Sequence, residues 1–353
     1  MPNEVAVLEV ADLSKSYVLR GGFFDAPRGP VQAVDRVSFS IARGQTFGLV
    51  GESGSGKTTI GRMIVRVVEP DRGEILFWDE ELGRIDLAKL SNRQLRPLRR
   101  KIQMVFQDPY SSLDPRMTVL RIVGEPIRAT GSRSPYATRE RVVQVLEMVG
   151  LRHEYMGRYP HAFSGGQRQR IGIARALATE PRLIIADEAV SALDVSVQAQ
   201  ILNLLRDLQK RLQLSYLFIA HDLGVIRYIS DVIGVMYGGR LVEIADKASL
   251  YRDPKHPYTE ALLSTAPRPE PLDAPIKAVA RGRSSQTGTV TCGCPYFSRC
   301  SYRQDICARE IPQLHEISPS HTVACHFDLE LANRDSHGDC PPAEKGVTQL
   351  HDA

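Results

Sequence analysis

Short apolar runs alternate with amphipathic stretches along the first two thirds of the chain. Four apolar runs have the length of β-strands and lie at 46–50 (TFGLV), 102–106, 183–186 (LIIA) and 216–220 (YLFIA). Between them, residues 142–149 and 197–208 repeat apolar side chains at intervals of three and four, the pattern of an amphipathic helix. Strands that alternate with helices predict an α/β domain with a mostly parallel sheet.

This alternation ends near residue 267. Residues 267–288 are rich in Pro, Arg and Ser and lack a sustained period, which predicts a linker. A Cys-rich segment follows at 289–327, and the polar residues of 328–353 predict a disordered tail. We therefore expect one large domain over residues 1–266 and a small, separate module at 289–327.

Length and charge indicate an ordinary globular protein. The chain has 353 residues, which suits about two domains of ~150 residues each. Its 45 Lys and Arg against 41 Asp and Glu leave a net charge of +4, which excludes histone-like and acidic-tail proteins. A basic run at 93–101 contains Leu95 and Leu98 and no aromatic side chain, which favours a solvated helix face over a nucleic-acid site.

The N-terminus and the cysteines bear on the cellular compartment. Residues 1–10 contain Glu4 and Glu9 and lack the basic start and unbroken apolar run of a secretory signal. The sequence also lacks the ~20 consecutive apolar residues of a membrane-spanning helix, so any membrane role is expected to be peripheral. All six Cys lie beyond Thr291, and in the reducing cytosol expected for this chain clustered Cys more often bind metal than form disulfides.

A glycine-rich octamer directly follows the first apolar run. Residues 51–58 read GESGSGKT, which fits the phosphate-binding loop G-x-x-x-x-G-K-[ST] between a strand and a helix. Its glycines allow backbone N–H groups to surround phosphates, Lys57 would reach the β- and γ-phosphates, and Thr58 would offer a hydroxyl to Mg²⁺. The alternative for the octamer alone is a plain glycine turn.

A second motif, LIIADE at 183–188, is an apolar strand that ends in two carboxylates. Asp187 suits a Mg²⁺ ligand acting through water, and Glu188 suits a general base that orients water. An Asp-Glu pair after a strand is, by itself, more often a turn or a helix cap. Together with the phosphate loop, however, it predicts nucleotide hydrolysis.

A third motif, FSGGQ at 163–167, opens an amphipathic helix. A helix N-terminus with Ser and Gly residues is a second anion-binding position. For Ser164 considered alone, a simple N-cap is an equally good interpretation.

These motifs occur in an order that resembles the ATP-binding subunits of ABC transporters. The set also contains Gln107 in VFQDP, Ser191 to Asp194 (SALD) and His221 in IAHD, and the resemblance covers about residues 8–263. The resemblance implies a P-loop ATPase core of α/β class with an antiparallel β subdomain and a helical subdomain.

Four longer sequence segments resemble the peptide-import branch of that family. They lie at 106–119, 164–177, 191–205 and 256–264. The loop at 20–30 resembles the second ATPase of heterodimeric di- and oligopeptide importers. Two departures from the family pattern are Ala189, where Pro is usual, and Ala162, where an acidic residue is usual, and neither removes a catalytic atom.

The resemblance assigns roles to single residues. Tyr17 would stack on adenine, Gln107 would contact Mg²⁺ and water, and His221 would hold the γ-phosphate and the attacking water. Without the family, Tyr17 is an ordinary strand aromatic and His221 a structural histidine. The implied ATP-binding residues are Tyr17, Gly51, Glu52, Ser53, Gly54, Ser55, Gly56, Lys57, Thr58 and Thr59. The implied Mg²⁺ residues are Thr58, Gln107 and Asp187, and the implied catalytic residues are Lys57, Gln107, Glu188 and His221.

The resemblance also implies a partner. Ser164, Gly165, Gly166 and Gln167 would close on the γ-phosphate of a second ATPase subunit in a head-to-tail dimer, and Asp194 would join the two chains. Two membrane permeases and an extracytoplasmic substrate-binding protein would complete an importer, with this chain on the cytoplasmic face of the membrane and no nucleic acid involved.

Four cysteines lie within the C-terminal segment, namely Cys294, Cys300, Cys307 and Cys325. Their spacing lacks the close pairs of usual zinc sites and does not decide between Zn²⁺, an iron–sulfur cluster and unligated thiols. The family resemblance implies a [4Fe–4S] cluster on these four residues, with Cys292 and Cys340 outside the pattern.

The sequence therefore predicts an ATPase subunit of a di- or oligopeptide importer. The transported solute is not encoded in this chain, so glutathione and nickel import stay open. A soluble ABC ATPase acting on nucleic acid or ribosomes would normally need two fused ATPase halves or a long coiled coil. This alternative is disfavoured because the sequence shows one set of motifs and no sustained heptads. An iron–sulfur redox protein with a nucleotide site is disfavoured because the hydrolytic motif set is intact.

Overall fold

The computed structural model describes residues 6–18, 30–108, 112–130, 134–265 and 293–327. The expected linker at 267–288, the tail at 328–353, Cys292 and Cys340 lie outside the described residues. An eight-stranded sheet runs through the centre, in the order β11 (His315–Ser318), β12 (His321–Val323), β10 (Arg240–Asp246), β9 (Val232–Tyr237), β3 (Thr46–Val50), β8 (Ser215–Ala220), β7 (Leu183–Asp187) and β6 (Ile102–Val105).

The middle of this sheet is parallel, as the sequence predicts. Strands β6, β7, β8, β3 and β9 pair in parallel, and β10, β12 and β11 continue the sheet in antiparallel pairing. Every residue of β3, β7 and β8 is buried, which explains why these strands are continuous apolar runs in the sequence. Their predicted bounds agree with the structure to within one residue.

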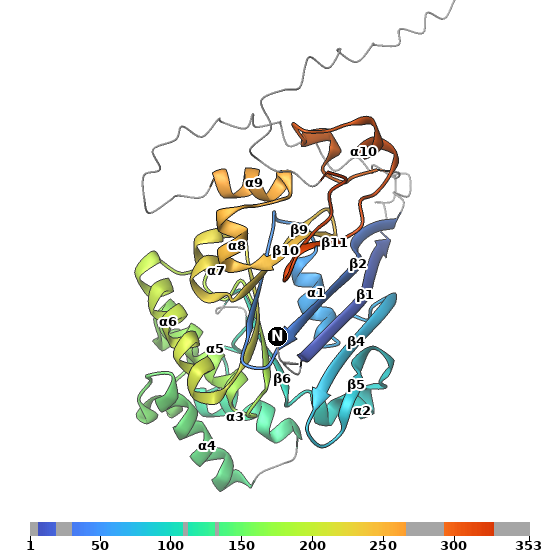
Figure 1. Cartoon of the computed structure of the whole chain (residues 1–353). Helices are drawn as coiled ribbons and strands as arrows, with labels where there is room; N and C mark the ends of the chain where they lie inside the picture. The colour runs from blue at the N-terminus through green and yellow to red at the C-terminus, as the bar shows by residue number, and fades with distance from the viewer. Residues whose placement is uncertain (1–5, 19–29, 109–111, 131–133, 266–292, 328–353) are drawn as a thin grey trace, which may run out of the picture.

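The sheet separates two hydrophobic cores. Because side chains alternate along a strand, Ile184 and Ala186 of β7 enter one core, and Leu183 and Ile185 enter the other. Figure 1 shows α5, α6 and α7 on one face of the sheet, and α1 with the antiparallel strands on the opposite face. The helices are α1 Lys57–Ile64, α2 Asn92–Leu98, α3 Val119–Thr130, α4 Pro135–Met148, α5 Gly165–Leu177, α6 Val195–Leu212, α7 Leu223–Ile229, α8 Lys247–Arg252, α9 Pro257–Ser264 and α10 Asp305–Arg309.

The antiparallel β subdomain and the helical subdomain are both present. The second sheet has the order β2 (Pro30–Ala42), β1 (Ala6–Val18), β4 (Arg72–Asp79) and β5 (Gly83–Asp86). Helices α3 and α4 lie together at the far end of the molecule from the C-terminal segment (Figure 1). Short 3₁₀ helices occur at η1 Leu87–Lys89, η2 His153–Gly157, η3 Pro160–Ala162 and η4 Phe297–Arg299.

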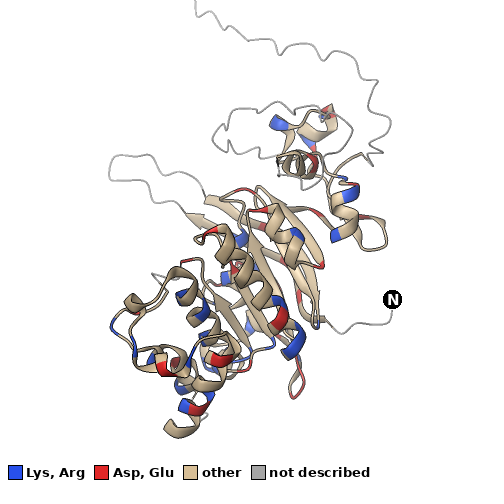
Figure 2. Cartoon of the chain, turned by 90° about the vertical axis from the view of Figure 1, so that its left-hand side faces the viewer, with Lys and Arg blue, Asp and Glu red and all other residues tan. Residues whose placement is uncertain are grey.

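The basic run at 93–101 forms a helix face and the turn that follows it. Leu95 and Leu98 of α2 are buried, while Arg93 and Arg96 are exposed, which confirms the predicted solvated helix face. Figure 2 shows residues of both charge signs along the helices of the molecule. Within the described residues, we find no helix that is long and apolar enough to cross a membrane.

The Cys-rich segment joins the ATPase sheet. Strand β12 pairs with β10, where Glu243, Ile244 and Ala245 face Val323, Thr322 and His321. Glu243 is fully buried, and its Oε1 lies 2.7 Å from Nε2 of His321. Residues 293–327 are thus anchored on the large domain by both backbone and side-chain hydrogen bonds.

Candidate active site

The phosphate loop lies where three parallel strands end. Strand β3 ends at Val50, which faces Ala220 of β8, and Asp187 of β7 faces Ile219 of β8. The carboxyl ends of these strands therefore meet at one edge of the sheet. This arrangement brings the loop at 51–56, the Asp187–Glu188 pair and His221 together.

The loop needs glycine at its last position. Gly56 has φ +101°, and a Cβ atom built there would lie 2.2 Å from the carbonyl oxygen of Ala33. Gly54 also has a positive φ of +81°, but no atom lies within 4 Å of its Cβ position. The tight chain path at Gly56 places the N-terminus of α1 at the loop, with its free N–H groups available to an anion.

Lys57 points back into the loop. Its Nζ donates hydrogen bonds to the carbonyl oxygens of Gly51 at 2.7 Å and Glu52 at 2.9 Å, and to Oγ of Ser55 at 3.3 Å. Burial lowers the pKa of Lys57, and the nearby carboxylates of Glu188, Asp187 and Glu52 oppose that shift. A buried ammonium enclosed by the loop can bind the phosphates that the loop surrounds.

Thr58 and Asp187 form a pair of hard oxygen donors. Oγ1 of Thr58 donates to Oδ1 of Asp187 at 2.9 Å. Burial raises the pKa of Asp187, with a further contribution from Glu188, while the hydrogen bond from Thr58 lowers it. A hydroxyl and a carboxyl group next to a phosphate site fit Mg²⁺, which prefers oxygen ligands and would favour the charged carboxylate.

Glu188 is the centre of a polar cluster. One of its carboxylate oxygens, Oε2, accepts a hydrogen bond from Nε2 of Gln107 at 2.8 Å and lies 3.3 Å from Nδ1 of His221. Its backbone has φ +48°, an uncommon conformation for a residue other than glycine, and its N–H donates to the carbonyl oxygen of Ile219. The structure thus brings together Gln107, Glu188 and His221, which lie far apart in the sequence.

The FSGGQ motif forms a complete helix cap. Oγ of Ser164 accepts from the N–H of Gln167 at 3.3 Å, and Oε1 of Gln167 accepts from the N–H of Ser164 at 3.1 Å. This capping box begins helix α5, and Ser164 is exposed. Over the described ranges, neither side chain hydrogen-bonds to the phosphate loop of the same chain.

Asp194 and Tyr17 lie outside the cluster around Glu188. Asp194 is the N-cap of α6, where its Oδ1 accepts from the N–H of Val197 at 3.0 Å. That hydrogen bond lowers the pKa of Asp194. Tyr17 lies near the end of β1 with 39% of its surface exposed, and Nζ of Lys15 is 5.8 Å from the centre of its ring.

Sequence reasoning missed the contacts of the phosphate loop with the C-terminal part of the chain. Oη of Tyr258 accepts from the N–H of Glu52 at 3.0 Å, and Nη1 of Arg299 lies 2.9 Å from both carboxylate oxygens of Glu52. The expected separation of the Cys-rich module from the loop therefore does not hold at Arg299. The contact spans 247 residues, so no local sequence signal indicates it.

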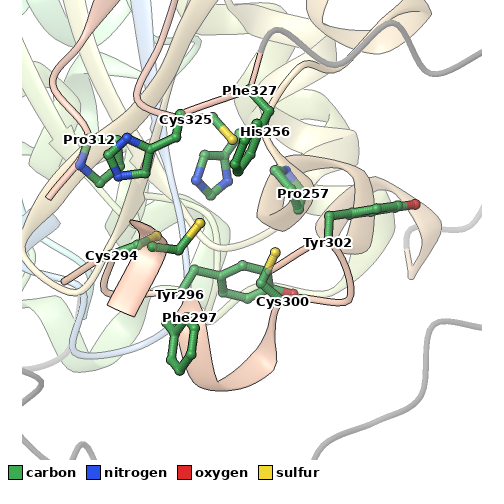
Figure 3. Close-up of a pocket in the computed structure, with 12 residues that line it drawn as sticks. His256, Pro257, Cys294, Tyr296, Phe297, Cys300, Tyr302, Pro312, Cys325 and Phe327 are labelled. Carbon is green, nitrogen blue, oxygen red and sulfur yellow. The ribbon is translucent and has the colours of Figure 1, made fainter. Parts of the chain in front are cut away.

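The four cysteines line one pocket. Figure 3 shows the sulfur atoms of Cys294, Cys300 and Cys325 around a common space beside His256 and Tyr296, and Cys307 also lines it. None of these four cysteines forms a disulfide bond within the described residues, and burial raises the pKa of Cys294 and of Cys300 to about 11. Across residues 6–327, apart from the stretches left out, we find no group of three or more His, Cys, Asp or Glu side chains arranged to hold a metal ion.

Comparisons with known proteins agree with this geometry. Residues 34–191 match the family model described as ABC transporter, and residues 242–307 match that of the oligopeptide/dipeptide transporter C-terminal region. The chain is 48% identical to the oligopeptide transport ATP-binding protein AppF of Bacillus subtilis, over 92% of this chain and 98% of that protein. It is also 48% identical to a putative peptide import ATP-binding protein of Brucella ovis, over 92% of this chain and 99% of the relative.

A solved structure supports the fold. A dimeric ATP-binding cassette in a post-hydrolysis state with ADP and Pi superposes with a TM-score of 0.58 at 29% sequence identity, covering 68% of this chain and 98% of the other. The family match at 34–191 contains the phosphate loop and the strands β3, β6 and β7 of the central sheet.

Proposed function

The chain belongs to the ATP-binding subunits of ABC transporters, with the C-terminal region of the oligopeptide/dipeptide transporters, and from this premise we propose that it hydrolyses ATP to power peptide import. The observation that carries the proposal is the convergence of Lys57, Thr58, Asp187 and Glu188 at one sheet edge. The C-terminal match at 242–307 and the names of the relatives favour peptides over other solutes. Glutathione and nickel remain alternative solutes.

We assign the following roles in hydrolysis. The loop at 51–59 and Lys57 bind the phosphates, while Tyr17 stacks on adenine. Thr58, Asp187 and Gln107 would hold Mg²⁺, which when bound neutralises charge on the β- and γ-phosphates. Glu188 orients the attacking water as general base, and its contacts with Gln107 and His221 keep its carboxylate at the site.

The exposed cap of α5 supports a second proposal, that of a head-to-tail dimer. Ser164, Gly165, Gly166 and Gln167 present a helix N-terminus outward, which is suited to the γ-phosphate in a partner ATPase. Asp194 lies on the connection between β7 and α6 and would join the chains. We propose a heterodimer at the cytoplasmic face of the membrane beneath two permeases, supplied by a substrate-binding protein.

We also propose that Cys294, Cys300, Cys307 and Cys325 hold a [4Fe–4S] cluster, with Zn²⁺ as the alternative. The support is that all four cysteines line the same pocket, as the ligands of one centre must. Bound metal would deprotonate the thiols, opposing the raised pKa values of Cys294 and Cys300.

The import function is tested in proteoliposomes that contain this chain, its partner ATPase and the permeases. We expect ATP hydrolysis to rise when the binding protein is added with a peptide, and labelled peptide to accumulate in the transport direction. Glutathione and Ni²⁺ serve as competing solutes. Stimulation by RNA or ribosomes, with no response to the binding protein, would instead support the soluble ATPase.

A further inference from the structure

Glu52, the second residue of the phosphate loop, is held from three directions. Its carbonyl oxygen accepts from Nζ of Lys57 at 2.9 Å, and its N–H donates to Oη of Tyr258 at 3.0 Å. Both of its carboxylate oxygens lie 2.9 Å from Nη1 of Arg299. Two of the three partners come from the C-terminal part of the chain.

Arg299 is itself held by aromatic side chains. It ends η4, and its guanidinium lies 5.8 Å from the ring centre of Tyr296 and 5.9 Å from that of Tyr237. The Tyr237 and Tyr258 rings lie 4.6 Å apart, and the Tyr258 and Tyr296 rings 5.4 Å apart. These three tyrosines form one cluster that orients Arg299 and also supplies the hydroxyl group to Glu52.

The charge of Glu52 matters because its loop binds a polyphosphate. An unpaired carboxylate in such a loop repels the phosphates, whereas a carboxylate paired with a guanidinium is largely neutralised. Arg299 is 35% and Glu52 47% exposed at the side chain, so the pair is partly screened by solvent. Its effect on nucleotide binding is therefore expected to be modest but measurable.

We propose that Arg299 is a positioning residue for the phosphate loop, which neutralises Glu52 and thereby lets the C-terminal segment set the affinity for MgATP. The proposal rests on the proposed function, since it takes this loop to bind ATP. It gives residues 293–327 a direct role at the nucleotide site in addition to their anchoring on β10.

A double-mutant cycle tests the proposal on the full-length chain. The Kd for a fluorescent ATP analogue with Mg²⁺ is measured for the wild type, Arg299→Ala, Glu52→Gln and the double variant. We expect Arg299→Ala to raise Kd by about two- to five-fold. The double variant should return to the Kd of Glu52→Gln alone, because the unpaired charge is gone.

In the assembled transporter, Arg299→Ala should raise KM for ATP and leave kcat unchanged, and Arg299→Lys should restore part of the affinity.

Arg303→Ala is the matched control, since its guanidinium lies in the same segment but is placed over the Phe297 ring, 5.8 Å from its centre. An unchanged Kd in Arg299→Ala would overturn the proposal. The proposal would also be overturned if Arg299→Ala raised Kd by the same factor in the wild type and in the Glu52→Gln variant, or if Arg303→Ala raised Kd as much as Arg299→Ala does. Each of these two rises in Kd would mean that the segment acts on nucleotide binding without this charge pair. A wild-type chain that binds no MgATP would overturn the proposed function itself, which distinguishes the two failures.

Discussion

At the scale of single residues, the proposed general base is Glu188. Its carboxylate oxygen Oε2 lies 2.8 Å from Nε2 of Gln107 and 3.3 Å from Nδ1 of His221, and its backbone has a left-handed φ of +48°. We expect Glu188→Gln to keep ATP binding, because size and shape are preserved, and to slow hydrolysis by about 10²–10⁴-fold, because the amide is not a base. The measurement is steady-state phosphate release by the assembled complex, beside the Kd for nucleotide.

Glu69→Gln provides the control for this variant, since Glu69 is 78% exposed at the side chain and follows α1 on the surface. It should turn over at the wild-type rate. Near-normal turnover by Glu188→Gln would instead exclude Glu188 as the base.

Two glycines of the phosphate loop, Gly56 and Gly54, are expected to respond differently to replacement by alanine. In Gly56→Ala, the new methyl group would lie 2.2 Å from a backbone oxygen of Ala33, so the loop must move and ATP affinity should fall by more than about tenfold. In Gly54→Ala, no protein atom lies within 4 Å of the new methyl group, so backbone strain of about 1 kcal/mol is the expected cost to the stability of the nucleotide-free fold. Nucleotide titration of Gly56→Ala and thermal unfolding of both variants check these expectations, and equal losses of thermal stability would contradict the steric argument.

The residues predicted from sequence are those whose chemistry is encoded locally. Lys57 and Thr58 follow from the octamer, and Asp187 and Glu188 from the end of an apolar strand, because strand ends in a parallel sheet converge. The contact of Glu52 with Arg299 was not predictable, since it depends on how a segment 247 residues away packs against the loop.

At the scale of secondary-structure elements, the burial of a strand determines whether its sequence pattern predicts it. Strands β3, β7 and β8 are buried on both faces and were predicted as apolar runs. Strands β11 (HEIS) and β12 (HTV) are short and polar, and they become strands because β10 offers a free edge and a buried carboxylate. Pattern alone could not identify them.

The anchoring of β12 gives a prediction about stability. Glu243 is fully buried and accepts from the N–H groups of Lys255 and His256 in addition to its contact with His321. We expect His321→Ala to cost about 1–3 kcal/mol, because a buried carboxylate loses a partner. Thermal unfolding and hydrogen exchange at β12 measure the effect. The matched control His315→Ala, at an exposed position of β11, should change stability by less than about 0.5 kcal/mol, and an equal loss in both variants would argue against the anchor.

The Cys pocket gives a prediction about metal. Protein purified without oxygen should be brown, with broad sulfur-to-iron absorbance and stoichiometric iron and sulfide. Replacing any of Cys294, Cys300, Cys307 or Cys325 by Ser should bleach it, and replacing Cys292 or Cys340 should not. Zinc in place of iron, or bleaching by Cys292→Ser and not by Cys325→Ser, would refute the cluster.

At the scale of the whole molecule, the two proposed halves of the ATP site do not hydrogen-bond to each other within the described part of the chain. The phosphate loop, Asp187 and Glu188 meet at one sheet edge, whereas the cap of α5 is closed on itself by Ser164 and Gln167. A solved structure with the same fold is a dimer with ADP and Pi. The site is therefore expected to be completed by a second subunit.

This arrangement predicts that the isolated subunit is a poor ATPase. Without a helix N-terminus from a partner, the γ-phosphate charge would be stabilised by Lys57, His221, the loop and bound Mg²⁺ alone, and the electrostatic part of catalysis would be incomplete. Mixing with the partner ATPase and the permeases should raise the rate, and the rate per subunit should increase with concentration until the complex is saturated. Replacing Ser164 by Arg should then remove hydrolysis at the partner's site, while the Kd of this chain's own loop for MgATP stays at the wild-type value. Full activity of the isolated chain that does not depend on its concentration would contradict the dimer, because such a chain would need no second helix to complete its site.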